Sequence, residues 1–170
     1  MQQLYAPWRM AYIKSEKLPV SGCIFCDKRQ STNDAQDLII ARSQHVYVMM
    51  NRYPYNSGHL MVLPYEHLHS QEQMSADALT DLMLTVNKAL AALRHAYRPS
   101  AFNLGVNLGE AAGAGITAHY HFHIVPRWAH DSNFMTVIGE TRIIPDSLEG
   151  IYADLTQAWA ALDILDSQNT

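Results

Sequence analysis

Three histidines alternate with apolar residues in segment 119–125, whose sequence is HYHFHIV. Because successive side chains of a β-strand point to opposite faces, a strand here places His119, His121 and His123 on one face, roughly 7 Å apart. The intervening side chains, which then point into the core, are Tyr120, Phe122 and Ile124. Three imidazoles on one strand face indicate a chemical site, and three surface histidines without a function are the alternative.

A neutral imidazole can attack a phosphorus atom directly, and the resulting phosphoramidate has a good leaving group once it is protonated. We expect the central residue, His121, to be the nucleophile, because its two neighbours on the strand can reach the ligand or the metal-binding side. His123 is expected to hold His121 in the required tautomer or to contact the phosphate. His119 completes the predicted catalytic face.

The loop before this strand, residues 109–115, consists almost entirely of glycine and alanine. Glycine lets a backbone approach a ligand closely, so backbone N–H groups in this loop, which ends at Gly115, are candidates for contacts with phosphate oxygens. Asn107 and Thr117 are polar side chains near it that can donate hydrogen bonds. A loop of this composition is equally compatible with a simple turn.

The chain has two cysteines, Cys23 and Cys26, in a Cys-x-x-Cys spacing. In a chain without an export signal, this spacing indicates metal or redox chemistry more than a structural disulfide. Two thiolates supply half of the ligands that tetrahedral zinc requires. A redox pair is the rival interpretation, although no thioredoxin-like βαβ pattern surrounds the cysteines.

Size and composition favour a small soluble protein. With 170 residues, 48% of them apolar, the chain is long enough for one hydrophobic core, and we expect a single domain over residues 1–170. The sequence shows neither a membrane-spanning stretch nor a signal peptide, so we expect a cytoplasmic protein without membrane contact. A net charge of −4 argues against binding to a nucleic acid polymer but allows a small anionic ligand.

Residue periodicity predicts an antiparallel sheet with helices on one face. A long helix is expected over residues 76–97, with Ser75 as its N-cap, and a C-terminal helix over 148–165. The polar run 28–37 is expected to be an exposed loop. Strands are predicted over residues 37–41, 45–50, 59–63, 102–108 and 119–125, with short ones near 135–138 and 142–144. Hairpin-like strands interrupted by one long helix indicate an α+β fold.

The His-x-His-x-His motif, followed by two apolar residues, resembles the signature of the histidine triad (HIT) family. Residues 51–64 are similar to the family's segment that leads into the central sheet. Residues 6–10 and 125–128, with 133–134 downstream, resemble the bacterial branch of diadenosine tetraphosphate hydrolases and phosphorylases. The resemblance implies a HIT-like α+β fold with an antiparallel sheet of about five strands, a homodimer, and cleavage at an α-phosphate through a nucleotidyl-histidine intermediate.

The resemblance also implies roles for residues outside the triad. Asn51 matches an asparagine that faces ribose and phosphate, and His59 matches a residue that supports the catalytic face. Ile116 departs from the pattern, because many family members carry a phosphate-contacting Gln and then Ser or Thr there, and the nearest hydroxyl here is that of Thr117.

Some relatives resemble this chain in having a cysteine pair that two histidines complete into a zinc site. The matching histidines here are His67 and His119, which with Cys23 and Cys26 would form a structural site. Its four ligands would leave no position for water and would fix His119 in place.

Several functions fit this pattern. The first is cleavage of diadenosine polyphosphates, with water or inorganic phosphate as acceptor. Magnesium bound to the polyphosphate substrate is compatible with this function. The alternatives are a nucleoside phosphoramidase and a nucleotide-binding module without turnover, and the intact His121 favours an enzyme. Arg127 either binds a phosphate or is a surface charge.

Overall fold

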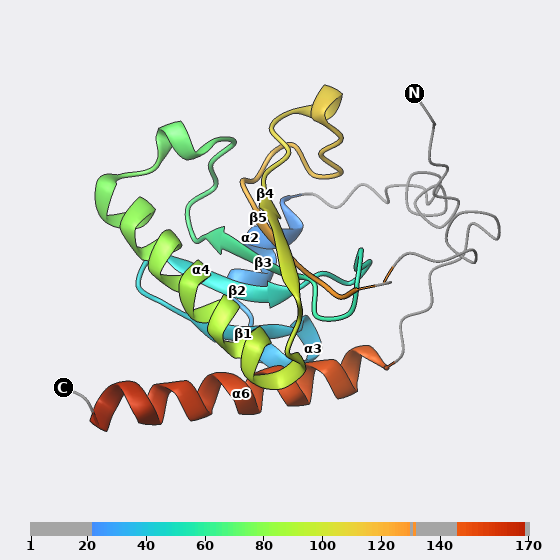
Figure 1. The fold of residues 1–170 in the computed structure, drawn as a ribbon. Coiled ribbons are helices and arrows are strands. Elements are labelled where there is room, and N and C mark those ends of the chain that lie inside the picture. Colours follow the sequence, from blue (N-terminus) through green and yellow to red (C-terminus); the bar gives the residue numbers. More distant parts are fainter. Residues whose placement is uncertain (1–21, 130, 132–145, 169–170) are drawn as a thin grey trace.

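The computed structural model describes residues 22–129, 131 and 146–168. In this part of the chain, five antiparallel strands form one sheet in the order β1-β2-β3-β5-β4 (Figure 1). The strands are β1 (Ile39–Arg42), β2 (Val46–Met50), β3 (Leu60–Pro64), β4 (Ala101–Gly105) and β5 (Phe122–Arg127). This arrangement confirms the predicted α+β class and the size of the sheet.

The long helix α4 (Ala76–Tyr97) has the predicted limits. The Ser75 hydroxyl accepts a hydrogen bond from the Ala78 N–H at 3.2 Å, which satisfies one of the unpaired donors of the first turn. Arg98 ends the helix in a left-handed conformation, with φ of 48°. The buried side of α4 packs on the sheet through Leu82, Val86 and other apolar residues.

The C-terminal helix α6 (Leu148–Gln168) packs across α4 and β1 (Figure 1). Ile151 and Leu155 are its fully buried contacts with the core. The helix extends three residues beyond the predicted limit at 165. No helix in the described ranges is both long enough and apolar enough to cross a membrane.

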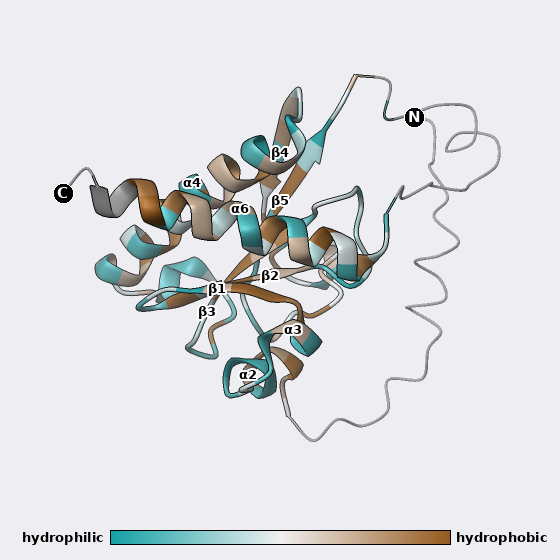
Figure 2. Cartoon of the chain, turned by 90° about the horizontal axis from the view of Figure 1, so that it is seen from below, coloured by the Kyte–Doolittle hydropathy of each residue, from teal (hydrophilic) through white to brown (hydrophobic). Residues whose placement is uncertain are grey.

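The two faces of the sheet bury different residues. On one face, Val48, Val62 and Ile124 belong to the core that α4 and α6 cover. On the other face, Phe25 of the short helix α2 (Ile24–Arg29) packs against Met49 and its neighbours. Figure 2 shows α4 and α6 on one side of the sheet and α2 on the opposite side. The prediction of helices on one face therefore holds for the two long helices, whereas α2 covers the second face.

The histidine segment differs from its predicted form. Strand β5 begins at Phe122, because the residues before it bond to the chain after β3 instead of joining a ladder: the Tyr120 N–H donates to the Leu68 carbonyl oxygen at 2.6 Å. Alternation nevertheless continues through the segment. The residues that face the core of α4 and α6 are Tyr120, Phe122 and Ile124, as predicted.

Three other predictions are not matched by the described structure. Strand β4 ends at Gly105, three residues earlier than expected. The polar run 28–37, expected to be a loop, contains the end of α2 and the short helix α3 (Asp34–Asp37), which the Asn33 side chain caps. The short strands predicted near 135–138 and 142–144 lie outside the described residues.

Candidate active site

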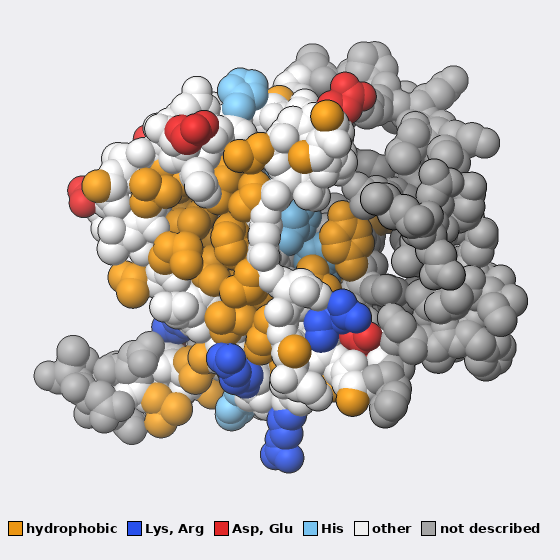
Figure 3. All heavy atoms as spheres, turned by 45° about the horizontal axis from the view of Figure 1, so that its top comes forward, with side chains coloured by type: hydrophobic (Ala, Val, Ile, Leu, Met, Phe, Trp, Pro, Cys, Tyr) orange, Lys and Arg blue, Asp and Glu red, His pale blue; other side chains and the backbone are white. Residues whose placement is uncertain are grey.

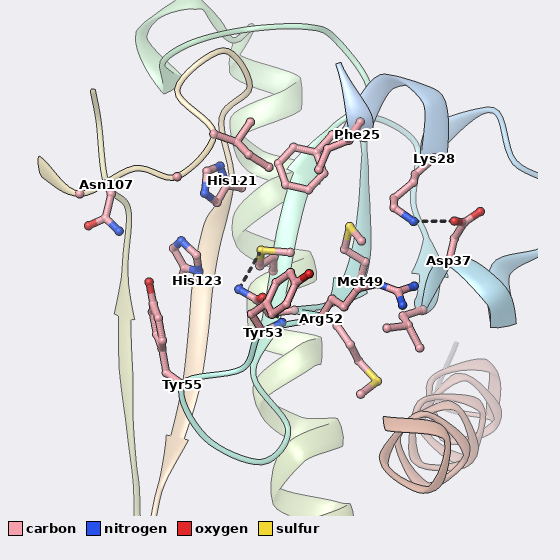
Figure 4. A pocket seen from close by; sticks show the side chains of 18 residues that line it. Phe25, Lys28, Asp37, Met49, Arg52, Tyr53, Tyr55, Asn107, His121 and His123 are labelled. Carbon is pink, nitrogen blue, oxygen red and sulfur yellow. Dashed lines mark hydrogen bonds and ion pairs between the residues drawn. The ribbon is translucent and has the colours of Figure 1, made fainter. Parts of the chain in front are cut away.

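His121 and His123 line a pocket on the face of the sheet that carries α2 (Figure 4). Seven of the other lining residues are apolar, and they come from α2, the end of the short helix α3, β2, β3 and the loop before β5. These apolar residues are Ile24, Phe25, Leu38, Met49, Met50, Met61 and Ile116. Histidine side chains are visible beside apolar ones in a hollow of the surface (Figure 3). The pocket thus combines two imidazoles with walls that suit a flat apolar group.

The His121 ring is held in one tautomer. Its Nδ1 lies 2.8 Å from the carbonyl oxygen of His119, an acceptor, so Nδ1 carries the proton and Nε2 carries the lone pair. Burial lowers the pKa of His121, which favours the neutral ring at physiological pH. The Phe25 and His123 rings lie against it, at centroid distances of 5.5 and 4.8 Å. His121 therefore has the neutral form and the Nε2 lone pair that a nucleophilic imidazole requires.

A further imidazole, that of His59, lies behind His123. The Tyr55 N–H donates to Nδ1 of His59 at 3.1 Å, so the proton of His59 is on Nε2. That nitrogen lies 2.9 Å from Nδ1 of His123, which must accept the bond. Burial lowers the pKa of His59 to about 3, and the ring stays neutral. His123 accordingly carries its own proton on Nε2 and can act as a donor in the pocket.

His119 is turned away from the pocket and toward the two cysteines. Its Nε2 donates to the Pro64 carbonyl oxygen at 2.9 Å, which leaves the lone pair on Nδ1. That Nδ1 lies 3.4 Å from Sγ of Cys23 and 3.6 Å from Sγ of Cys26, and Nδ1 of His67 lies 3.3 Å from Sγ of Cys26. The four ligand atoms of this cluster all lie within 4.8 Å of one another.

The three distances of 3.3, 3.4 and 3.6 Å between these ligand atoms fit a tetrahedral metal ion. Zinc bonds of about 2.3 Å to sulfur and about 2.0–2.1 Å to nitrogen place tetrahedral ligand atoms roughly 3.3–3.8 Å apart. Burial lowers the pKa of His119 to about 4, so the ring is in the neutral form that a metal requires. Burial and the adjacent Cys23 thiol raise the pKa of Cys26, a cost that a bound cation removes. Two sulfur and two nitrogen donors are typical of structural zinc.

The residues predicted to bind substrate divide into two groups. Asn51, Asn107 and Gly115 line the pocket. His59 lies behind His123 and does not line it, and Thr117 is exposed and does not line it either. The side-chain oxygen of Asn51 accepts a hydrogen bond from the Tyr53 N–H at 2.9 Å, so this loop orients the amide.

Two pocket residues, Phe25 and Tyr55, lack a recognisable signal in the sequence. Phe25 lies inside the Cys-x-x-Cys segment and reaches both His119 and His121, each at a centroid distance of 5.5 Å. Tyr55 stacks on His59 at 4.7 Å and lines the pocket. The only hint of Tyr55 was its place in the segment that resembles the HIT family. Nothing local to either residue marks it as part of a site.

Arg127 does not line the pocket, and it is not an isolated surface charge. Its guanidinium forms a two-point ion pair with Asp131, with nitrogen–oxygen distances of 2.6 and 2.7 Å, and Nη1 donates to Asn103. Asn56 donates to the same carboxylate at 3.0 Å. This network ties the loop before β3 to the end of β5, so Arg127 has a structural role.

The five-stranded antiparallel sheet, with His119 and His121 just before β5 and His123 on it, has the arrangement expected of a histidine triad protein. The sequence profile of the HIT domain matches residues 32–130, more than half of the chain. The chain therefore belongs to the HIT family.

Similar sequences and structures agree with this assignment. The AP-4-A phosphorylase of Mycobacterium tuberculosis is 36% identical over 166 residues, which cover 94% of this chain and 85% of the relative. Protein hit of Bacillus subtilis is 28% identical, over 68% of this chain and 78% of its own length.

The solved structures show the same fold. A Zn-bound histidine triad family protein from Mycobacterium smegmatis has a TM-score of 0.69 at 24% identity, over 85% of this chain and 98% of its own. The Plasmodium falciparum diadenosine triphosphate hydrolase has a TM-score of 0.58 at 16% identity, over 75% and 78%.

Proposed function

We propose that this protein cleaves diadenosine polyphosphates, such as diadenosine tetraphosphate, at an α-phosphate through a nucleotidyl group on His121. The observation that carries the proposal is the tautomer of His121, whose Nε2 lone pair is set by the bond from Nδ1 to the His119 carbonyl oxygen. The apolar walls of the pocket suit a nucleoside base. The names of the tuberculosis relative, a phosphorylase, and of the Plasmodium hydrolase point to the same substrate class.

The reaction then takes two displacements. In the first, Nε2 of His121 bonds to the α-phosphorus, and the bond from that phosphorus to the bridging oxygen breaks, releasing ATP from diadenosine tetraphosphate. The Nε2–H of His123 stabilises the departing oxygen. In the second, water or inorganic phosphate attacks the same phosphorus and loses a proton, and His121 leaves as a neutral ring. The second step gives AMP when water is the acceptor and ADP when inorganic phosphate is the acceptor. Asn51 and Asn107, which line the pocket, contact ribose and phosphate in this proposal.

A product analysis tests this function and identifies the acceptor. The protein is incubated with diadenosine tetraphosphate, with and without inorganic phosphate, and the nucleotides are separated by anion exchange. ATP with AMP in the absence of phosphate identifies a hydrolase, and ATP with ADP only in its presence identifies a phosphorylase. No cleavage in either condition, for the wild type as for His121→Asn, rejects the proposal and directs the work to nucleoside phosphoramidates and then to a binding module.

We propose that Cys23, Cys26, His67 and His119 hold a structural zinc ion. The ion would join α2 to the chain after β3 and to the segment before β5, and so would fix the walls of the pocket. All four ligands are supplied by protein, so zinc supplies no open position for a reacting water. Cysteines bind zinc only when they are reduced and do not form a disulfide. Because the cytoplasm keeps cysteines reduced, we also propose a cytoplasmic location.

We further propose that the chain is a single domain that forms a homodimer through β4 and α4. Strand β4 lies at the edge of the sheet, and Leu104 on it is 47% exposed. Met83 of α4 is 48% exposed, and Figure 3 shows hydrophobic side chains gathered over this side of the molecule. An open strand edge beside apolar side chains favours pairing with a second copy.

Sedimentation velocity tests the dimer. Leu104→Glu should give a monomer, whereas the control Leu165→Glu, on the exposed side of α6, should stay dimeric. A monomeric wild-type protein rejects the dimer.

A further inference from the structure

An ion pair lines the pocket in addition to the histidines. Lys28, in the last turn of α2, and Asp37, at the end of α3, approach to 2.5 Å between Nζ and Oδ1. Each side chain is 22% exposed, and both residues belong to the pocket lining. Figure 4 shows the pair across the pocket from His121 and His123, with the Met49 side chain between them. A fixed donor thus lies beside a fixed acceptor on the wall opposite the candidate nucleophile.

If the proposed function is taken as the starting point, the ion pair lies where the base of a bound nucleotide would end. With the α-phosphorus at His121, the attached base extends away from the histidines. The apolar side chains of Phe25 and Met49 flank that direction (Figure 4). The edge of a purine held between such walls faces the side of the pocket that Lys28 and Asp37 form.

We propose that Lys28 and Asp37 read the edge of the base and select adenine. The Asp37 carboxylate accepts a hydrogen bond from the exocyclic 6-amino group, and the Lys28 ammonium donates one to the ring nitrogen N1. Adenine carries this donor and this acceptor side by side. The 6-oxo purines, hypoxanthine and guanine, carry an acceptor at position 6 and a donor at N1. They would place an oxygen against the carboxylate and an N–H against the ammonium.

The surroundings of Asp37 keep its carboxylate charged. The hydrogen bond from Lys28 and a second bond from the Ser31 hydroxyl lower the pKa of Asp37, so the carboxylate remains an acceptor. A mismatched base makes neither hydrogen bond to the pair and sets donor against donor and acceptor against acceptor, and this loss sets the selectivity. A pyrimidine edge lies closer to the ribose by the length of one ring and does not reach the pair.

The rival role for this ion pair is a staple between α2 and α3. The helix α2 has other attachments: Phe25 is buried in the second core, and the Arg29 guanidinium donates to the Tyr65 carbonyl oxygen. A charge-swapped double variant, Lys28→Asp with Asp37→Lys, separates the two roles. It keeps the attraction between the helices and exchanges the donor with the acceptor.

The test is calorimetric binding of AMP and of inosine monophosphate, which differ in the base edge alone. The wild type should bind AMP about 10- to 100-fold more tightly, as expected for two hydrogen bonds to charged groups. Asp37→Asn and Lys28→Met should reduce this ratio to about 3-fold or less. The swapped variant should prefer inosine monophosphate. The control Lys88→Met, which breaks a surface ion pair with Asp163, should keep the wild-type ratio.

The results separate this inference from the proposed function. Equal affinities of the wild type for the two nucleotides, or an unchanged preference for AMP in the folded swapped variant, would overturn the assignment to Lys28 and Asp37, even if diadenosine tetraphosphate is cleaved. Selective AMP binding that follows the variants as expected, without any cleavage, would support base reading and reject the enzymatic proposal. Thermal melts of each variant confirm that it is folded.

Discussion

His59 and His123 are joined ring to ring, with Nε2 of one 2.9 Å from Nδ1 of the other. Since the Tyr55 N–H fixes the proton of His59 on Nε2, a backbone group in the loop before β3 determines which nitrogen of His123 carries a proton. A residue outside the histidine motif therefore controls the hydrogen-bonding state of a residue inside it. His59 is a positioning residue in this arrangement, because it does not line the pocket.

Replacing His59 by Phe should lower kcat about 10- to 100-fold and leave KM nearly unchanged, because His123 loses the bond that sets its tautomer while the pocket keeps its walls. His59→Gln, whose amide can still donate to His123, should recover part of the loss. Steady-state kinetics with diadenosine tetraphosphate measure both constants. A change in KM alone would show that His59 shapes the pocket and does not position His123.

The same residue should make the protein sensitive to acid. The pKa of His59 falls from 6.5 to about 3 on burial, so between these values the unfolded chain binds a proton that the folded chain does not. The stability that this neutral ring allows is present above about pH 6.5 and is lost as the pH falls toward 3, by an amount on the order of 5 kcal/mol.

Urea unfolding of the wild type and of His59→Gln over this pH range measures the effect. The variant should show a shallower loss of the free energy of unfolding, whereas His95→Gln, at an exposed position of α4, should follow the wild type. Parallel curves for all three proteins would mean that His59 does not account for the acid sensitivity.

Cobalt provides a spectroscopic test of the metal site. Protein refolded with Co²⁺ should show the strong visible absorption of a tetrahedral ion, with a thiolate charge-transfer band, because the cluster offers two sulfur and two nitrogen donors. Cys26→Ser should weaken the charge-transfer band and lower the melting temperature, and His69→Gln, next to the cluster but outside it, should change neither. A weak spectrum typical of octahedral cobalt, like that of the ion in water, would reject the site.

The periodic elements of the fold were predictable from the sequence because each buries one face. Helix α4 has its predicted limits, since the Ser75 cap and the spacing of its buried residues are local signals. The alternation of Tyr120, Phe122 and Ile124 also holds, although β5 begins only at Phe122. Where a segment forms the hydrogen bonds of a sheet depends on its partner strand. The backbone N–H of Tyr120 bonds to the chain after β3 instead of to a neighbouring strand.

The base end of the pocket was not predictable in the same way. Lys28 and Asp37 lie in a polar run that has the composition of an exposed loop, and their ion pair depends on the docking of α2 on the sheet, to which Phe25 contributes. Phe25 in turn has no periodic partners within its own six-residue helix. Contacts that depend on how one short segment docks on a distant strand leave no pattern in the local sequence.

The covalent intermediate is the most direct test of the account. The protein is mixed with diadenosine tetraphosphate labelled at the α-phosphorus and denatured within the first turnover, and the label on the protein is measured and located by peptide mapping. We predict an acid-labile, base-stable phosphoramidate on His121, and in His121→Asn no label with turnover lowered by at least about 1,000-fold. Label on another residue, or near-normal turnover in the variant, would contradict the assignment of His121 as the nucleophile.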